Sequence, residues 1–219
     1  MSLPRMGHAF ERPRLRMVNE QLVAQGISDE RVLEAMREVP RHLFVDSALG
    51  GHAYKDKSLP IGAGQTISQP YMVAKMTQLL ELKGHERVLE IGTGCGYQTA
   101  VLSRLCRRVY SIERIPALME LARSNLRAAR HANVMLKCDD GTKGWHEYAP
   151  FDAILAAAGG LHVPDAWMEQ LCDGGLLVMP VGEHGQHILI RRTKSGSQFS
   201  EERYDDCCFV PLVNEVCHQ

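Results

Sequence analysis

Val88-Leu-Glu-Ile-Gly-Thr-Gly-Cys-Gly-Tyr97 carries the clearest structural signal in this sequence. It begins as a short apolar strand and ends in three glycines spaced two apart, Gly92, Gly94 and Gly96. Glycine permits a tight turn from strand to helix and lets the backbone approach a ligand closely. Glu113 ends the next apolar run about 20 residues later, the usual distance for a carboxylate that hydrogen-bonds ribose hydroxyls. The stretch therefore predicts a nucleotide-type cofactor turn.

The spacing of the glycines distinguishes between cofactors. The dinucleotide fingerprint is G-x-G-x-x-G, whereas here Tyr97 stands where its third glycine would be. A dinucleotide turn also holds a pyrophosphate at a helix N-terminus, and the carboxylate of Glu90 would repel phosphate. The same carboxylate can support an ammonium group, directly or through water. The pattern favours S-adenosylmethionine over NAD; the alternative is a plain glycine-rich turn with two surface glutamates.

Composition narrows the class of protein. The chain has 219 residues, enough for one large α/β domain or two small ones, a net charge of −1 and a pI near 6.8. It lacks the strong positive charge that attracts nucleic acid. No apolar run approaches the roughly 20 residues that a membrane-spanning helix needs. The arginines near the N-terminus are followed by no apolar stretch, so they do not form a secretory signal. We expect a cytoplasmic monomer that binds neither nucleic acid nor membrane.

The cysteines and histidines give no sign of a metal site. The seven cysteines are an odd number without C-x-x-C spacing, and the ten histidines show no ligand spacing such as H-E-x-x-H. This usage is typical of reduced thiols in the cytosol rather than of a disulfide framework or a zinc site. We therefore expect no metal.

The periodicity predicts a flexible basic arm over residues 1–16 and one domain over residues 17–219. N-terminal helices and a substrate and cofactor loop occupy 17–82, and a core sheet occupies 86–219. Helices are expected at 17–25, 28–39 (beginning near Ser28), 70–82, 97–105, 116–129 and 165–171. Strands are expected at 87–91, 108–112, 134–137, 151–156 and 176–180, followed by two antiparallel strands at 187–192 and 202–211. Residues 41–70 show no periodicity, which indicates a long functional connection. Alternation of strands and helices predicts a doubly wound, mostly parallel α/β sheet.

A second stretch carries a family resemblance. Leu59-Pro-Ile-Gly, followed by Gln65-Thr-Ile-Ser-Gln-Pro-Tyr-Met-Val-Ala74, resembles the signature of protein-L-isoaspartate (D-aspartate) O-methyltransferases. The resemblance continues through the glycine turn, Asp140-Gly141, Phe151-Asp-Ala-Ile154 and Phe209-Val-Pro-Leu212, and covers nearly the whole chain from Met17. It implies a seven-stranded Rossmann-like methyltransferase sheet with extra N-terminal helices.

The resemblance also implies an activity and a site. Members transfer a methyl group from S-adenosyl-L-methionine to the free α-carboxylate of L-isoaspartyl, and in some cases D-aspartyl, residues in damaged proteins and peptides. The ester collapses to a succinimide that reopens partly to aspartate, so the implied role is protein repair. Ser68 matches the active-site serine. The implied cofactor residues are Gln65, Thr66, Ile67, Ser68, Glu90, Gly92, Thr93, Gly94, Gly96, Glu113, Arg114, Asp140 and Gly141, and the implied substrate residues are Ser68, Ala157, Ala158 and Val213.

A lone serine suits this chemistry. The attacking carboxylate is already ionised at pH 7, because its pKa is about 4, so it needs no general base. A neutral hydroxyl can orient it without the full opposing charge of lysine or arginine. Ser68 is also a candidate helix cap, because Pro70 follows closely, and Asp140 is a candidate for an Asp-Gly turn.

Three departures from the family pattern leave alternatives open. Asp139 replaces a glycine, Cys95 replaces a serine, and residues 157–161 (Ala-Ala-Gly-Gly-Leu) replace a Thr-Ala-Ala-Pro stretch. The last lies near the expected substrate mouth and is the only feature that favours a cofactor-binding protein without catalysis. A methyltransferase of a small metabolite is a separate alternative. Nucleic-acid methylation is disfavoured, because the chain has neither an Asn/Asp-Pro-Pro-aromatic motif after the fourth core strand nor a Pro-Cys pair.

Overall fold

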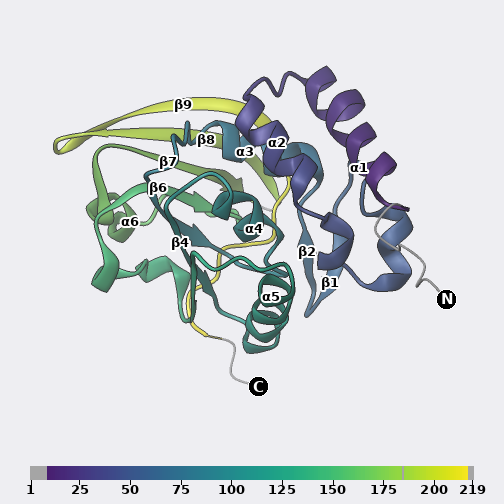
Figure 1. Ribbon diagram of the computed structural model, residues 1–219. Coiled ribbons are helices and arrows are strands. Elements are labelled where there is room, and N and C mark those ends of the chain that lie inside the picture. Colours follow the sequence, from purple (N-terminus) through teal and green to yellow (C-terminus); the bar gives the residue numbers. More distant parts are fainter. Residues whose placement is uncertain (1–8, 184, 217–219) are drawn as a thin grey trace.

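The computed structural model describes residues 9–183 and 185–216. Within this part of the chain, a seven-stranded sheet in the order β5-β4-β3-β6-β7-β8-β9 forms the centre of the molecule (Figure 1). The pairs from β5 to β7 are parallel, and β8 and β9 are antiparallel additions at one edge. The strands are β3 (Arg87–Ile91), β4 (Arg108–Glu113), β5 (Val134–Cys138), β6 (Phe151–Ala156), β7 (Leu171–Glu183), β8 (Gln186–Ser195) and β9 (Gln198–Cys207). The predicted doubly wound sheet is confirmed.

Six α-helices and several shorter turns accompany the sheet in the described residues. The helices are α1 (Glu11–Arg16), α2 (Glu30–Glu38), α3 (Pro70–Gln78), α4 (Tyr97–Ser103), α5 (Pro116–Ala128) and α6 (Asp165–Gln170). The shorter elements are η1 (Met17–Leu22), η2 (Val23–Gln25), η3 (Arg41–Phe44), η4 (Ser47–His52), η5 (Gly141–Lys143) and η6 (His146–Tyr148).

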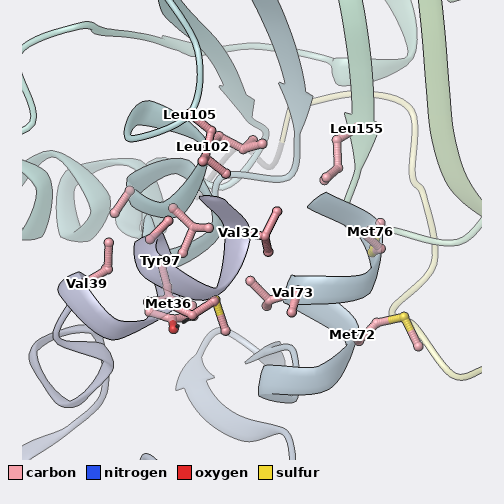
Figure 2. Close-up of a cluster of buried hydrophobic side chains, with 14 of the residues drawn as sticks. Val32, Met36, Val39, Met72, Val73, Met76, Tyr97, Leu102, Leu105 and Leu155 are labelled. Carbon is pink, nitrogen blue, oxygen red and sulfur yellow. Dashed lines mark hydrogen bonds between the residues drawn. The ribbon is translucent and has the colours of Figure 1, made fainter. Parts of the chain in front are cut away.

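Side chains on the two faces of the sheet belong to separate apolar clusters, which explains the unbroken hydrophobic runs of the central strands. Val88 packs with the N-terminal helices, α3 and α4, whereas its neighbour Leu89 packs with Trp167 of α6. Figure 2 shows the first cluster, in which Met36 of α2, Val73 of α3 and Tyr97 of α4 converge. The N-terminal helices are therefore part of the core.

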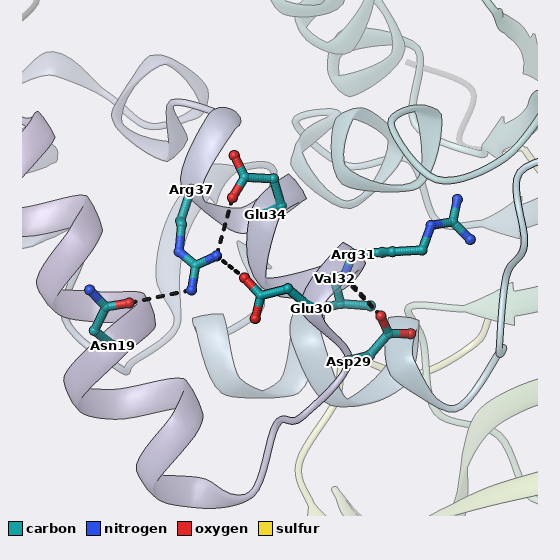
Figure 3. A network of polar contacts seen from close by, with 7 residues as sticks. All are labelled: Asn19, Asp29, Glu30, Arg31, Val32, Glu34 and Arg37. Atoms are coloured by element: carbon teal, nitrogen blue, oxygen red, sulfur yellow. Dashed lines mark hydrogen bonds and ion pairs between the residues drawn. The ribbon is translucent and has the colours of Figure 1, made fainter.

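The N-terminal region differs from two predictions. Residues 11–16, expected in a flexible arm, form α1, and η1 and η2 continue it to Gly26, whose left-handed φ of 86° ends the run. Residues 1–8 of the expected arm lie outside the described residues. Ser28 does not cap α2; the Asp29 carboxylate accepts from the backbone amides of Arg31 and Val32 (Figure 3). A carboxylate at the positive end of the helix dipole satisfies free amides and is a strong cap.

Residues 41–70 contain more structure than the absence of periodicity suggested. After η3 and η4 they form a two-stranded hairpin, β1 (Leu59–Gly62) and β2 (Gln65–Ile67), with left-handed residues Ala63 and Gly64 at its tip. Strands this short are below the length at which alternation can be detected. The hairpin leads directly into α3 and carries the signature segment.

The last strand is displaced from its predicted position. The structure ends β9 at Cys207, four residues before the predicted end of the strand at residue 211, and the following residues leave the sheet. In Figure 1 the yellow chain after β9 turns back toward the middle of the sheet. In the described residues, no helix has the length and apolar character needed to cross a membrane.

Candidate active site

A cavity opens at the carboxyl ends of β3, β4 and β6, where parallel α/β sheets place their ligands. The glycine turn, the hairpin and the segment after β9 all contribute to its wall. The sequence-predicted residues that line it are Gln65, Thr66, Ile67, Ser68, Gly92, Thr93, Gly94, Glu113, Arg114, Gly141, Ala157, Ala158 and Val213. The fold thus brings together residues that lie up to 148 positions apart, from Gln65 to Val213. Three predicted residues, Glu90, Gly96 and Asp140, do not line the cavity.

The glycine turn needs its glycines for backbone reasons. Gly92 and Gly94 have φ values of 91° and 56°, which residues with a side chain rarely adopt. The amides of Gly92 and Thr93 both donate to the Ile112 carbonyl, which ties the turn to the end of β4. A Cβ at Gly94 would lie 3.2 Å from Ile61 of the hairpin, so the hairpin lies against the turn. Gly96 acts elsewhere: a Cβ there would meet Leu126 of α5 at 3.1 Å.

The Glu113 carboxylate is hydrogen-bonded to the backbone of the glycine turn. Its carboxylate accepts from the Gly94 amide at 2.8 Å and from the Ile115 amide at 3.0 Å, and the residue is 5% exposed. A carboxylate has about four acceptor positions, so each oxygen can still accept from a ligand hydroxyl. The geometry fits a ribose at this edge of the cavity.

Glu90 lies beneath the cavity rather than in its wall. Its Oε2 accepts from the Thr99 hydroxyl at 2.5 Å and the Ser111 hydroxyl at 2.6 Å, and its Oε1 is buried without a partner in the described structure. Burial raises the pKa of Glu90 to about 7, opposed by the two hydroxyl hydrogen bonds and supported by the negative charge of Glu113. A buried acceptor without a donor costs folding free energy. The free Oε1 of Glu90 can therefore accept a hydrogen bond from a ligand cation or from a water.

Asp140 forms the turn that the sequence offered as its alternative role. Its carboxylate accepts from the amide and the hydroxyl of Thr142, at 2.9 and 2.6 Å, and so caps η5. Gly141 reaches the cavity, and a Cβ there would lie 2.5 Å from Ile91. The departure at Asp139 has a local explanation, since its carboxylate pairs with Lys137 at 2.7 Å and accepts from the Asp140 amide. That ion pair lowers the pKa of Asp139.

Ser68 stands where the cavity meets a second, more open groove. Both are lined by Thr66, Ser68, Ala157 and Val210, and the groove continues along β8 and the end of β9. The capping alternative for Ser68 is wrong, because the cap residue of α3 is Gln69 and no side chain caps that helix. Among the described residues the Ser68 hydroxyl has no hydrogen-bond partner, and the side chain is half-buried. It is free to donate to a ligand that reaches the junction.

Comparison with known proteins identifies the family. Residues 14–217 match the model of the protein-L-isoaspartate (D-aspartate) O-methyltransferase family. A protein-L-isoaspartate O-methyltransferase 1 of Syntrophobacter fumaroxidans is 58% identical over 94% of this chain and 96% of its own length. A protein-L-isoaspartate O-methyltransferase of Halorhodospira halophila is 53% identical over 95% and 94%. The chain belongs to the protein-L-isoaspartate O-methyltransferase family.

Solved structures agree with this membership in the family. One protein-L-isoaspartate O-methyltransferase structure has a TM-score of 0.84 at 28% identity, covering 93% of this chain and 67% of that one. A Plasmodium falciparum protein, provisionally named as a family member and determined with S-adenosyl-L-homocysteine, has a TM-score of 0.80 at 24% identity, covering 91% and 98%. At 24% identity, the similarity to the Plasmodium falciparum protein shows a shared fold and no more.

This methyltransferase carries its departure at residues 157–161 beside the cavity mouth. The Gly159 amide donates to the Val210 carbonyl at 2.9 Å, and the Leu212 amide donates to the Gly159 carbonyl at 2.6 Å. These bonds hold the segment after β9 over the cavity. A Cβ at Gly159 would lie 2.2 Å from Nε2 of His187, whose Nδ1 accepts from the Phe209 amide at 3.4 Å. The missing side chain at residue 159 therefore makes room for the His187 ring.

Sequence reasoning missed several residues of this site. His187, 5% exposed, lines the groove, and burial lowers its pKa, which favours the neutral ring. Residues 210–212 line the cavity, although their motif contributed only to the family resemblance. Arg41, behind Ser68, had no signal other than its place after Pro40 in an unpatterned stretch. In the described residues no group of three His, Cys, Asp or Glu side chains could hold a metal.

Proposed function

We propose that this protein-L-isoaspartate O-methyltransferase uses the junction at Ser68 to join cofactor and substrate. The observation that carries the proposal is that one serine with an unpaired hydroxyl lines both the cavity and the roomier groove. The cavity collects the residues predicted to bind the cofactor, and the groove suits an extended peptide better than a small metabolite.

The residues of the cavity fit S-adenosyl-L-methionine. The turn at Gly92 and Gly94 would lie against the methionine part, and Glu113 would accept from the ribose hydroxyls. Gly141 would border the adenine, and the unpartnered oxygen of Glu90 would support the ammonium group through a water. When bound, the cofactor supplies a methyl group on a positively charged sulfur.

The protein contributes to the reaction by aligning the substrate carboxylate with the methyl group of the cofactor. The isoaspartyl α-carboxylate is ionised at pH 7, so the site needs no base, and no side chain among the described residues hydrogen-bonds the Ser68 hydroxyl. The Ser68 hydroxyl donates to one carboxylate oxygen and leaves the other free to attack. The hairpin and residues 210–213 line the cavity, and the water that the bound ligands displace there strengthens the attraction between the carboxylate and the positive charge opposite. The methyl ester then loses methanol and closes to a succinimide without the enzyme, and hydrolysis of the succinimide gives aspartate in part.

The substrate class is damaged protein or peptide carrying L-isoaspartate, with D-aspartate as a second acceptor. We also propose that the enzyme works as a cytoplasmic monomer, independently of nucleic acid and membrane. Its near-neutral charge and the six free cysteines of the described residues support this setting.

The Ser68→Ala variant tests the assignment, with Ser28→Ala as a matched surface control. In Ser68→Ala we expect kcat on an isoaspartyl peptide to fall on the order of 100-fold, because alignment is lost. The affinity for S-adenosylhomocysteine, measured by calorimetry, should change less than about threefold, and Ser28→Ala should match the wild type in both measurements. An unchanged kcat in Ser68→Ala would remove Ser68 from the mechanism.

A further inference from the structure

Arg41 is a fully buried cation directly behind the Ser68 loop. It begins η3, is 0% exposed and lines neither the cavity nor the groove. Its Nη2 donates to the Ser68 carbonyl at 2.7 Å and its Nε donates to the Ala53 carbonyl at 2.8 Å. The side chain therefore contacts the backbone of the proposed active-site serine from outside the lining of both hollows.

The same guanidinium also contacts the cofactor side of the site. It lies 4.8 Å from the centre of the Tyr97 ring, and Tyr97 is the first residue of α4, immediately after Gly96 of the glycine turn. Arg41 thus joins the element that carries Ser68 to the element that leaves the glycine turn. No other described side chain bonds to the Ser68 backbone.

Stability alone does not account for this residue. Arg41 pairs with no carboxylate among the described residues, and its Nη1 is buried without a partner. A buried ion whose charge is not neutralised loses several kcal/mol of hydration, and well-packed apolar side chains often replace buried charges without loss of stability. Burial accordingly lowers the pKa of Arg41, although a guanidinium stays charged. Unlike an apolar side chain, the planar guanidinium of arginine can donate to two carbonyls in fixed directions.

We propose that Arg41 is a positioning residue that fixes the Ser68 hydroxyl at the junction of cavity and groove. It acts through the Ser68 carbonyl, which holds residues 65–68 in register with the glycine turn. The inference rests on the role proposed for Ser68. It assigns Arg41 no contact with substrate or cofactor, which agrees with its absence from the lining of both.

A double-mutant cycle tests this inference. Arg41→Lys and Arg41→Met are each made in the wild type and in Ser68→Ala, and kcat is measured with an isoaspartyl peptide well below the melting temperature of each protein. Arg31→Lys is the control, because Arg31 also donates to two backbone carbonyls, those of Leu82 and Leu105, away from the site. Arg41→Met keeps the test usable if lysine does not fold in this position.

The expected result is a coupling between the two sites. Loss of Arg41 should lower kcat about tenfold in the wild type and less than about twofold in Ser68→Ala, because a misplaced hydroxyl matters only when the hydroxyl is present. Affinity for S-adenosylhomocysteine should stay within about threefold, and Arg31→Lys should keep the wild-type kcat. Equal losses in both backgrounds, a loss that follows cofactor affinity, or failure of both Arg41 variants to fold would overturn the proposal. If Ser68→Ala itself keeps full activity, the proposed role of Ser68 fails instead.

Discussion

The cofactor half and the substrate half of the site are built in different ways. The proposed cofactor half consists of the turn at Gly92 and Gly94, which follows β3, and of the carboxylates of Glu90 in β3 and Glu113 in β4. The proposed substrate half consists of Ser68, Ala157 and residues 210–213, which come from the end of the hairpin, a loop and the segment after β9. One local unit thus forms the proposed cofactor half, and contacts between distant segments form the proposed substrate half.

The largest expected effect concerns the buried charge of the cofactor half. The folded Glu90 carboxyl keeps its proton up to a pH of about 7, whereas an unfolded one loses it near 4.5. The contribution of Glu90 to the free energy of unfolding therefore falls as pH rises from about 4.5 to about 7, by on the order of 3 kcal/mol, and is constant above. Urea titrations across this range should show that loss for the wild type relative to Glu90→Gln. A constant difference between the two proteins would contradict the burial argument.

The next effect separates strain from binding in the glycine turn. Gly92→Ala and Gly174→Ala place a side chain at similar left-handed φ values, 91° and 75°, but only Gly92 lines the cavity. Both variants should lose roughly 1–2 kcal/mol of stability. Gly92→Ala alone should weaken S-adenosylhomocysteine binding about 30-fold, near 2 kcal/mol. If Gly174→Ala weakens binding equally, the turn contributes general stability rather than a cofactor contact.

The smallest effect lies in the substrate half. Gly159→Ala would place a Cβ 2.2 Å from the His187 ring and disturb the segment held by the Phe209 and Leu212 amides. We expect KM for the isoaspartyl peptide to rise about fivefold, near 1 kcal/mol, with cofactor affinity unchanged. His187→Ala added to Gly159→Ala should recover most of the loss, because the clash disappears. An equal KM in the wild type, Gly159→Ala and the double variant would mean that peptide binding does not depend on the contact between Gly159 and His187.

The same contrast explains what the sequence could predict. The glycine turn, Glu113 and the central strands are local patterns with strong periodicity, and the structure places them as expected. Arg41 and His187 could not be found, because their importance depends on which distant backbone they meet. Ser28 and its neighbour Asp29 are equally good helix caps by residue type, so the sequence could not show that α2 begins after Asp29. The hairpin strands were too short for periodicity. Glu90 and Asp140 do not line the cavity, because Glu90 is fully buried and the Asp140 carboxylate is engaged in the turn with Thr142.

The most direct measurement compares two peptides that differ only in the linkage of one residue, L-isoaspartyl or L-aspartyl. Transfer of a labelled methyl group is followed as initial rates at equal peptide concentration. The groove and the Ser68 junction predict a rate at least about 100-fold higher for the isoaspartyl peptide, because only its free α-carboxylate reaches the aligned position. Equal rates on both peptides, or transfer to neither, would contradict the account.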